Sequence, residues 1–449
     1  MGGEKRTLLV RTSKMLHFLI TIALFAYFWE RFLQEYHINI AARYHVLVCI
    51  GYAFLMYFFC RTYDAYLIEY SRIVDIAFSL NLSSAIAVIL TYAAIMVGWE
   101  KYYSPRYFII LLVVQIIFNA LWTMAAIKVY YAYNKPAKTL LVYRNKTDLM
   151  RLNEVDRFGK KYKVERRLEN PQSYEEVVQA IGDCETIFLA GVNADIRNGV
   201  AKYCMETGVR GFFLPHVGDI ILMGGSHVRA FSVPIIGLQN TGGHPEYLLL
   251  KRAVDILLSL LAIIILSPLM LITAVAIKLY DRGPVLYKQV RLTKGGREFK
   301  IYKFRSMRPD AEKDGVARLS SGKDDERITP VGKVLRACRL DELPQLFNIF
   351  KGDMTIVGPR PERPEIAKDY AEAMPAFNLR LKVKAGLTGY AQVYGKYNTD
   401  PYDKLEMDLI YINKMGLLMD LQLMFATVRI LFKKDSTEGI SKDETTAMK

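Results

Sequence analysis

The sequence has few cysteines and none at a spacing that would bind a metal. Its five cysteines are scattered along 449 residues, without a Cys-x-x-Cys motif or a cysteine–histidine cluster. Neither a zinc site nor a disulfide framework is therefore indicated, and a reducing environment fits the soluble parts of the chain. The sequence also lacks any recognisable nucleic-acid-binding motif, so we predict no nucleic-acid partner despite the formal net charge of +15.

Apolar and basic residues are what the chain has in excess. Apolar residues make up 52% of it, and its mean hydropathy of +0.13 is high for a soluble protein. A basic balance attracts anionic membranes and anionic substrates as well as nucleic acids. Because the chain also contains long apolar segments, we expect the lipid bilayer and phosphate-bearing substrates to account for the charge.

Four apolar segments in the first third of the chain predict transmembrane helices. They cover approximately residues 15–32, 40–60, 73–99 and 107–130. Each approaches or exceeds the roughly 20 residues that a spanning helix needs. No small-residue cleavage site follows the first segment, which indicates an anchor instead of a removed signal peptide. Asp75, Asn81 and Asn119 are polar residues inside these spans, where they could line a pathway. We expect them instead to form interhelical hydrogen bonds.

Residues 1–135 are therefore predicted to form a four-helix transmembrane bundle. Basic residues concentrate in the first tail, in the loop of residues 61–72 and after Lys128. By the positive-inside rule these parts face the cytoplasm, which places both soluble domains there.

Residues 136–243 change to the pattern of a soluble α/β module. Strand-like runs at 139–143, 186–190 and 211–214 alternate with helical stretches at 174–181 and 197–207. This alternation is typical of βαβ units in a parallel sheet. A dinucleotide site would need a glycine-rich turn after the first strand, and residues 143–147 contain no glycine. We predict a Rossmann-like cytosolic module that binds no nucleotide.

A fifth apolar run, within residues 251–280, differs from the other four. Basic residues flank it at both ends, and Ser267-Pro268 lies in its middle. Proline kinks a helix, and a neighbouring serine hydroxyl can satisfy a freed backbone group. Cations at both ends favour the same membrane face, so we predict a re-entrant helix with its break at Ser267 and Pro268. The alternative is an ordinary spanning helix, which would place everything after Leu279 outside the cytoplasm.

Two adjacent acids, Asp341 and Glu342, lie in an otherwise apolar and basic segment. The apolar residues beside them favour burial, namely Leu340, Leu343, Leu346 and Phe347. Arginines, including Arg336 and Arg360, are near in sequence. A carboxylate pair on a buried frame with arginines nearby suits phosphate and metal chemistry. A structural cluster of ion pairs is the alternative interpretation.

Two further residues stand out on either side of this segment. Lys303 alternates with Tyr302 and Phe304 in a half-buried strand pattern, which also suits a basic strand near lipid headgroups. Asp408 is an acid on a helix that is otherwise largely apolar. Arg336, Arg360 and Asp408 could each serve to hold the fold together instead of binding a substrate.

Several motifs between residues 247 and 434 resemble, in order, those of the bacterial sugar transferase family. They are Gly283-Pro284, Gln289-Val290-Arg291, Lys303-Phe304-Arg305-Ser306-Met307, residues 340–345, residues 357–361, Gly386-Leu387-Thr388-Gly389 and residues 408–412. The family comprises the monotopic phosphoglycosyl transferases, also called polyprenyl-phosphate hexose-1-phosphate transferases. The resemblance implies an α+β monotopic catalytic domain at residues 244–449. The spans and the middle module look like the large, multidomain form.

The resemblance also implies an activity. A sugar-1-phosphate would pass from a UDP-sugar to undecaprenyl phosphate with release of UMP. The expected cargo is glucose- or galactose-1-phosphate, with an N-acetylated sugar phosphate as the alternative. This is the first step of capsule, exopolysaccharide or O-antigen synthesis at the bacterial inner membrane. Asp341 would be the nucleophile that forms a phosphosugar–aspartyl intermediate, with Glu342 as its catalytic partner. A carboxylate is ionised at neutral pH and needs no base to attack.

The remaining roles follow from the negative charge of the substrate. Mg²⁺ is the expected cofactor, with Glu342 as one ligand and Asp408 as another. Lys303, Arg336 and Arg360 are expected to bind the substrate phosphates. Asp408 would take part in substrate binding through the metal.

Two alternative functions belong to other classes. A glycosyltransferase would move the sugar without its phosphate and release UDP, and the Asp-Glu-Leu-Pro-Gln motif argues against it. A membrane-bound assembly protein with an inactive transferase domain is a second alternative, against which the intact acids and arginines argue. Residues 1–243 could dimerise the chain, regulate it or couple it to a flippase. Because the middle module looks catalytically empty, we expect them to drive assembly, and a homodimer is one form that this could take.

Overall fold

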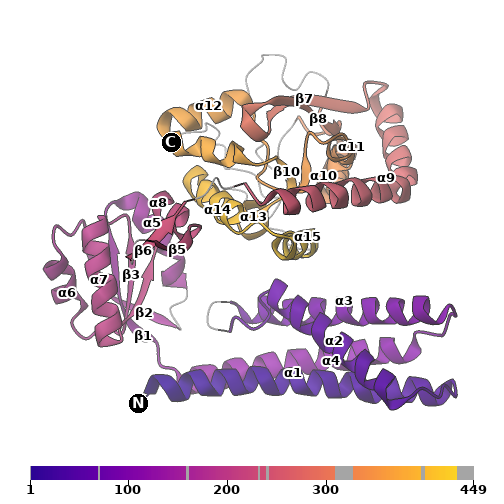
Figure 1. The fold of residues 1–449 in the computed structure, drawn as a ribbon, viewed down its shortest axis with the longest axis horizontal. Helices are drawn as coiled ribbons and strands as arrows, with labels where there is room; N and C mark the ends of the chain where they lie inside the picture. Colours follow the sequence, from indigo (N-terminus) through magenta and orange to yellow (C-terminus); the bar gives the residue numbers. More distant parts are fainter. Residues whose placement is uncertain are drawn as a thin grey trace. The chain divides into compact units, whose positions relative to one another are not determined.

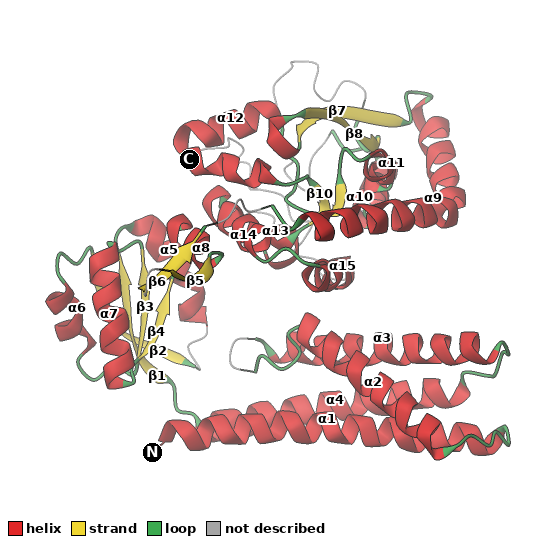
Figure 2. Cartoon of the chain, viewed as in Figure 1, coloured by secondary structure: helices red, strands yellow, loops and turns green. Residues whose placement is uncertain are grey.

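The computed structural model describes residues 2–68, 71–157, 161–230, 233–238, 242–308, 327–395 and 400–431. The chain divides into two compact units, Met1–Pro215 and His216–Lys449. Figure 1 follows the chain from end to end, and Figure 2 separates helices from strands. The first unit contains apolar helices and a parallel sheet, and the second carries all the residues for which a catalytic role is predicted.

Four apolar helices open the first unit, as the sequence predicts. They are α1 (Gly2–Glu35), α2 (Ala42–Thr62), α3 (Ile73–Trp99) and α4 (Arg106–Tyr133). By length and composition, all four could cross a membrane. α4 packs on α1 and α3, and α2 packs on α3.

A buried polar network joins these helices. The His17 ring lies 3.0 Å from Asn119 Oδ1 through Nε2 and 2.9 Å from the Tyr66 hydroxyl through Nδ1. Asn119 Nδ2 donates to Asn81 Oδ1 (3.0 Å) and to Ser84 Oγ (3.2 Å). The predicted interhelical hydrogen bonds of Asn81 and Asn119 are confirmed. Such bonds fix the packing of apolar helices, because a bilayer offers no water to satisfy polar groups.

A parallel four-stranded sheet with the order β2-β1-β3-β4 follows the helices. Its strands and helices are β1 (Ala137–Tyr143), α5 (Lys146–Arg157), β2 (Tyr162–Glu169), α6 (Tyr174–Ile181), β3 (Thr186–Ala190), α7 (Ala194–Thr207) and β4 (Arg210–Phe213). Successive residues of β1 face opposite sides of the sheet. Leu140 and Val142 pack with α6 and α7, whereas Leu141 packs with Val155 of α5. Helices therefore cover both faces, as expected when strands and helices alternate.

The second unit begins with α8 (Val217–Met223), β5 (Ser226–Ala230) and β6 (Val233–Gly237). Ile220 of α8 packs in a core with Leu405 and Leu409 of α14 (Pro401–Asn413). Asn413 Nδ2 also donates to the Ile220 carbonyl (2.7 Å). The sequence placed a domain boundary after residue 243, whereas this packing joins α8 to the second unit.

The rest of the second unit consists of short strands and helices around one long helix. They are α9 (Pro245–Asp281), β7 (Leu286–Leu292), β8 (Glu298–Phe304), α10 (Pro330–Ala337), α11 (Gln345–Lys351), β9 (Thr355–Val357), α12 (Pro364–Ala373), β10 (Gly386–Thr388), α13 (Tyr390–Tyr394) and α15 (Leu417–Leu431). β7 and β8 pair as an antiparallel hairpin. Gly295 and Gly296 turn it with φ of +71° and +75°, which glycine adopts without steric cost.

α9 is the fifth helix that is long and apolar enough to cross a membrane. Pro268 lies in its interior, and Figure 1 shows α9 bent into two arms. Leu266 in the first arm packs against β8 with Phe299 and Ile301, whereas Ile277 in the second packs against Phe304. The bend therefore brings both arms onto the same seven-residue strand.

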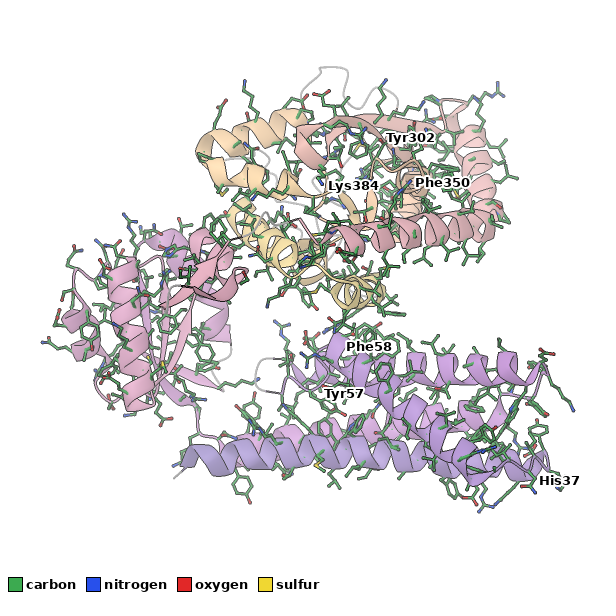
Figure 3. All side chains as sticks on the ribbon, in the orientation of Figure 1. His37, Tyr57, Phe58, Tyr302, Phe350 and Lys384 are labelled. Atoms are coloured by element: carbon green, nitrogen blue, oxygen red, sulfur yellow. The ribbon has the colours of Figure 1, made fainter. Side chains whose placement is uncertain are left out.

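The backbone of α9 stays helical through the bend. Ser267 Oγ donates to the Ile264 carbonyl (2.8 Å), the type of bond that satisfies backbone groups near a proline. Figure 3 shows side chains of α9 projecting away from the unit along both arms. Many of them are apolar and more than half exposed, including Leu257, Ile265 and Leu271.

Candidate active site

The two adjacent acids occupy a tight turn between two short helices. α10 ends before Arg339, whose φ of +52° reverses the chain, and a 3₁₀ turn (Leu340–Glu342) carries both acids. Leu340 and Leu343 pack toward Phe304 and Ile277, which ties the turn to β8 and α9. The expected burial of the flanking apolar residues is met in part. Leu346 is buried and Leu340 and Leu343 are half-buried, whereas Phe347 is 41% exposed.

α11 continues from this turn and is fastened to β8. Asn348 is fully buried, and its side chain accepts from the Tyr302 amide (2.9 Å) and donates to the Lys300 carbonyl (2.8 Å). These two bonds take the place of the backbone hydrogen bonds that a further strand would make with β8. They fix the acid turn relative to Lys303, which directly follows Tyr302 on the same strand.

Two cations converge on one oxygen of Glu342. Lys303 Nζ lies 3.3 Å and Arg360 Nη2 lies 3.2 Å from Glu342 Oε1. Burial alone would raise the pKa of Glu342, but Lys303 and Arg360 outweigh it and hold the pKa well below its ordinary value. Glu342 is therefore ionised at neutral pH. Burial also lowers the pKa of Lys303, which Glu342 partly offsets.

Asp341 has a different environment from its neighbour. Its side chain is 9% exposed, and within the described ranges no hydrogen bond or ion pair reaches its carboxylate. Burial, and after it the charge of Glu342, raises the pKa of Asp341, while Lys303, Arg336 and Arg360 act in the opposite direction. Two cations thus contact one acid, whereas the carboxylate of the other has no such partner within the described ranges.

Arg336 approaches the site from α10. Its Nε donates to Ser306 Oγ (3.0 Å), which follows the end of β8. Its charge favours the ionised form of Asp341. Lys303 and Arg360 thus contact Glu342, and the charge of Arg336 acts on Asp341. Their expected binding of substrate phosphates stays a prediction.

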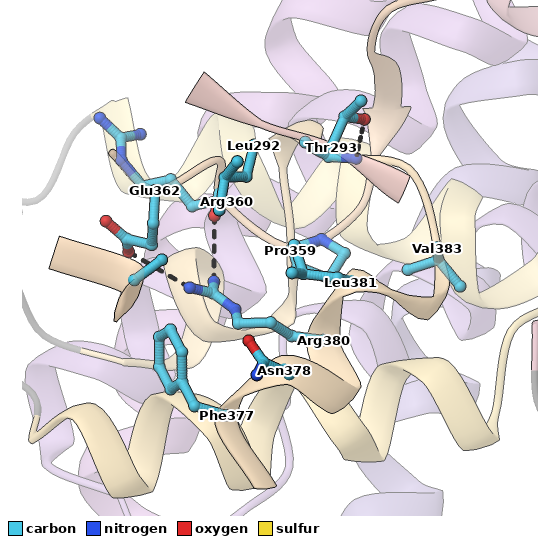
Figure 4. A pocket seen from close by; sticks show the side chains of 12 residues that line it. Leu292, Thr293, Pro359, Arg360, Glu362, Phe377, Asn378, Arg380, Leu381 and Val383 are labelled. Carbon is cyan, nitrogen blue, oxygen red and sulfur yellow. Dashed lines mark hydrogen bonds and ion pairs between the residues drawn. The ribbon is translucent and has the colours of Figure 1, made fainter. Parts of the chain in front are cut away.

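Asp408 has a different partner from the one expected. It is 1% exposed, and its Oδ2 accepts from Arg380 Nε (3.0 Å) and pairs with Arg380 Nη2 (2.7 Å). The same guanidinium donates to Glu362 Oε1 (3.3 Å) and to the Arg360 carbonyl (3.0 Å), as Figure 4 shows. Arg380 thus stabilises the loop that carries Arg360 through a hydrogen bond to the Arg360 carbonyl. Asp408 in turn fixes the position of the Arg380 guanidinium through their ion pair.

Two glycines let a second loop press against this one. A Cβ at Gly386 would lie 2.1 Å from the Gly358 nitrogen, and a Cβ at Gly389 would lie 2.2 Å from the Gly358 oxygen. Only glycine allows backbones to approach so closely. The backbone of the Gly-Leu-Thr-Gly motif (residues 386–389) therefore packs against the Gly-Pro-Arg-Pro turn (residues 358–361). This packing fixes the backbone position of Arg360.

The sequence interpretation missed Arg380 and Asn348. No role was predicted for Arg380, although an arginine in a stretch with Phe377 and Leu379 is a signal for a buried cation. Arg380 indeed lies 4.8 Å over the Phe377 ring. Nothing in the local sequence marks Asn348, because its role depends on a strand 46 residues earlier.

The residues present fit a magnesium ion that is shared with a substrate. Mg²⁺ usually binds one or two carboxylates, with substrate phosphates and water completing its octahedron. Asp341 and Glu342 offer adjacent carboxylates. In the part of the chain that the structure describes, no group of three or more His, Cys, Asp or Glu side chains is arranged to hold a metal. Asp408 is 1% exposed and pairs with Arg380, whereas Glu342 lies directly beside Asp341, so Glu342 is the better candidate ligand.

Comparisons with known proteins point to this unit. A family model described as bacterial sugar transferase matches residues 246–434. Over 190 residues the chain is 45% identical to a UDP-N-acetylgalactosamine-undecaprenyl-phosphate N-acetylgalactosaminephosphotransferase from Aeromonas hydrophila, covering 42% of this chain and 44% of that protein. Over 255 residues it is 35% identical to a UDP-glucose:undecaprenyl-phosphate glucose-1-phosphate transferase from Klebsiella pneumoniae, covering 55% and 54%.

A shorter relative is matched almost completely. The chain is 42% identical over 190 residues to an exopolysaccharide production protein from Rhizobium leguminosarum bv. phaseoli, covering 40% of this chain and 94% of that protein. The match thus spans about half the length of the first two relatives and nearly all of the third.

Proposed function

The chain belongs to the bacterial sugar transferase family, and from this premise we propose that it transfers a sugar-1-phosphate from a UDP-sugar to undecaprenyl phosphate. The products are undecaprenyl-diphospho-sugar and UMP. The expected cargo is glucose- or galactose-1-phosphate, and one relative's name adds N-acetylgalactosamine phosphate. The observation that carries the proposal is the contrast within the acid pair. Two cations contact Glu342, whereas within the described ranges no hydrogen bond or ion pair engages the Asp341 carboxylate beside it.

Transfer proceeds in two displacements at one phosphorus atom. An Asp341 carboxylate oxygen attacks the phosphorus that bears the sugar, and the bond from this phosphorus to the bridging oxygen breaks to release UMP. An oxygen of undecaprenyl phosphate then attacks the same phosphorus. The bond to Asp341 breaks, which restores the carboxylate and leaves the diphosphate-linked sugar on the lipid.

The cations of the site make this attack of an anion on an anion feasible. Arg360 and Arg336 can each present two N–H groups to phosphate oxygens, and Lys303 adds a compact charge. A bound Mg²⁺, with Glu342 as its protein ligand, would neutralise further negative charge on the diphosphate. Glu342 also keeps Lys303 and Arg360 in place between turnovers, because both contact its Oε1.

The acceptor explains why a bent apolar helix belongs to the catalytic unit. Undecaprenyl phosphate carries its phosphate at the membrane surface, so the nucleophile must work at that depth. We propose that α9 is re-entrant, with both soluble parts on the cytoplasmic face of a bacterial inner membrane. The product would initiate a capsule, an exopolysaccharide or an O-antigen.

Nucleotide release by the purified full-length protein tests the proposal. With Mg²⁺, undecaprenyl phosphate and a panel of UDP-sugars, we expect UMP from at least one donor. Asp341→Asn is expected to release none, whereas Asp369→Asn, an exposed acid on α12, serves as the matched control. Without acceptor, the wild type is expected to release about one UMP per active site, because the first displacement stops at the covalent stage.

Each other outcome selects an alternative. UDP in place of UMP would show transfer of the sugar without its phosphate. Neither nucleotide from any donor would favour an assembly protein with an inactive transferase domain.

A further inference from the structure

A charged cavity lies in the second unit, beside the first arm of α9. Its volume is about 180 Å³, and the start of α9, β9, the loop before β10 and the end of α14 line it. On the same measure a single water needs roughly 10–15 Å³, so the cavity has room for a phosphate group and part of its substituent. It does not include the acid pair.

Cations outnumber acids among its lining residues. The charged residues that line it are Lys251, Arg252, Lys294, Lys384 and Asp255. Asp255 is already satisfied, because its Oδ2 accepts from Thr355 Oγ1 (2.7 Å) and its Oδ1 accepts from the Ile356 amide (3.0 Å). The cavity therefore presents a positive potential that its one carboxylate does not cancel.

Two of the four cations have structural partners. Lys251 Nζ lies 2.5 Å from Asp420 Oδ2, and Arg252 donates to the Ile349 and Phe350 carbonyls at the end of α11 (2.7 and 2.8 Å). These contacts fasten α9 to the unit and account for both side chains.

The other two cations, Lys384 and Lys294, have no such partner in the part of the chain that the structure describes. Burial, and after it the charge of Arg252, lowers the pKa of Lys384. An anion in the cavity would favour the charged form of Lys384 and would thereby offset both the burial and the charge of Arg252. Figure 3 labels Lys384 within this unit.

The position of the cavity on α9 indicates where the anion comes from. Leu248 lines the cavity, and the next residue, Leu249, is 75% exposed. The apolar arm that begins here is the part of the unit that we place in the bilayer under the proposed function. The cavity then lies at headgroup depth, where the phosphates of anionic lipids are concentrated.

We propose that this cavity is a second anion-binding site, separate from the acid pair, that takes a phosphate group through Lys384 and Lys294. An anionic phospholipid is the source that its position favours, and free phosphate is the other source of the same chemistry. A lipid held here would fix the depth of the α9 arm and hence of the unit at the membrane surface.

Binding to the purified full-length protein in detergent tests this proposal. The probes are dihexanoyl-phosphatidylglycerol, dihexanoyl-phosphatidylcholine as the lipid without net charge, and inorganic phosphate, each titrated by calorimetry and by the shift in unfolding temperature. Lys384→Gln and Lys294→Gln remove one charge each. Lys294 is exposed on a hairpin turn, so its replacement leaves the folded core intact. Lys368→Gln, on exposed Lys368 of α12, is the matched control.

We expect phosphatidylglycerol to bind more tightly than phosphatidylcholine to the wild type and to Lys368→Gln. In Lys384→Gln its dissociation constant is expected to rise about tenfold, the loss of one charge-assisted hydrogen bond. Equal binding of inorganic phosphate with the same dependence on Lys384 would identify free phosphate as the source. Absence of binding by all probes, or binding that neither lysine variant weakens, would overturn the proposal. Because no turnover is measured, failure here is distinct from failure of UMP release.

Discussion

Removing Arg380 is expected to damage both the stability of the catalytic unit and the position of Arg360. Arg380 is 5% exposed and contacts Asp408, Glu362 and the Arg360 carbonyl from one guanidinium. Arg380→Met keeps much of the side-chain volume but leaves Asp408, which is 1% exposed, without its cation.

The magnitude follows from burial. Breaking a buried ion pair by removing one partner costs about 3–5 kcal/mol, because an uncompensated charge remains in the interior. For a domain of roughly 230 residues, 1 kcal/mol shifts the unfolding temperature by about 2–4 °C, so we expect a decrease of about 6–20 °C. Arg297→Met is the matched control. Its guanidinium is 59% exposed in the pair with Asp353, and such surface pairs contribute only about 0–1 kcal/mol.

The second variant, Arg380→Met combined with Asp408→Asn, separates charge from packing. If the uncompensated carboxylate causes the loss, the double variant recovers a substantial part of the unfolding temperature. UMP release should stay low in the double variant when it is measured well below the unfolding temperatures of the double variant and of the wild type. The reason is that the Arg360 carbonyl has lost its hydrogen bond from Arg380. Normal activity in a stable double variant would contradict the positioning role of Arg380.

The pH dependence of Arg380→Met gives an independent check. Burial raises the pKa of Asp408, and Arg380 is the main group that lowers it. Without Arg380 the pKa of Asp408 in the folded state rises further above its unfolded value. The folded state then binds more protons than the unfolded state, so its stability increases as pH falls through that pKa. The difference in free energy of unfolding between Arg380→Met and the wild type should therefore become smaller toward acid pH. A difference in stability that does not change with pH would refute the reasoning.

Three further predictions concern other parts of the chain. Glu342→Gln is expected to lower UMP release about 10²-fold or more, because Lys303 and Arg360 lose their shared anion; a full rate at raised Mg²⁺ would contradict this. Cysteines can be introduced at Glu246 and Arg282, at the two ends of α9, after native Cys338 has been replaced. Both should react with an impermeant thiol reagent from the same side of sealed vesicles. Reaction from opposite sides would show that α9 crosses the bilayer. His17→Ala should lower the free energy of unfolding by about 0.6–1.7 kcal/mol, whereas an unchanged unfolding midpoint would show that the buried network contributes little.

The acid pair was accessible to sequence reasoning because its members are adjacent and its frame is local. Leucines on both sides predict burial wherever the segment lies. The convergence of Lys303 and Arg360 on one oxygen was not accessible in this way, since they lie 39 and 18 residues from Glu342. Only the resemblance to a known family placed these residues at one site before the structure did.

Asp408 illustrates what a local pattern cannot decide. An acid on an apolar helix suits a metal ligand as well as a buried ion pair, and the partner that decides between them is 28 residues earlier. β2 illustrates the same limit for secondary structure. Its charged residues gave no strand-like apolar run, because it is the edge strand of the sheet and much of it is exposed.

The geometry of α9 depends on contacts at both of its ends as much as on Pro268. Arg252 near its start donates to the end of α11, and Asp281 at its end pairs with Arg305 just after β8. A straight helix from residue 252 to residue 281 would be about 44 Å long, enough to cross the roughly 30 Å hydrocarbon core of a bilayer. α11 and β8 are themselves joined through Asn348, so both anchors belong to one small frame. A spanning helix would separate these anchors by the thickness of the membrane and break one set. The contacts at the two ends therefore favour the re-entrant form independently of the proline, which serves to make the required bend inexpensive.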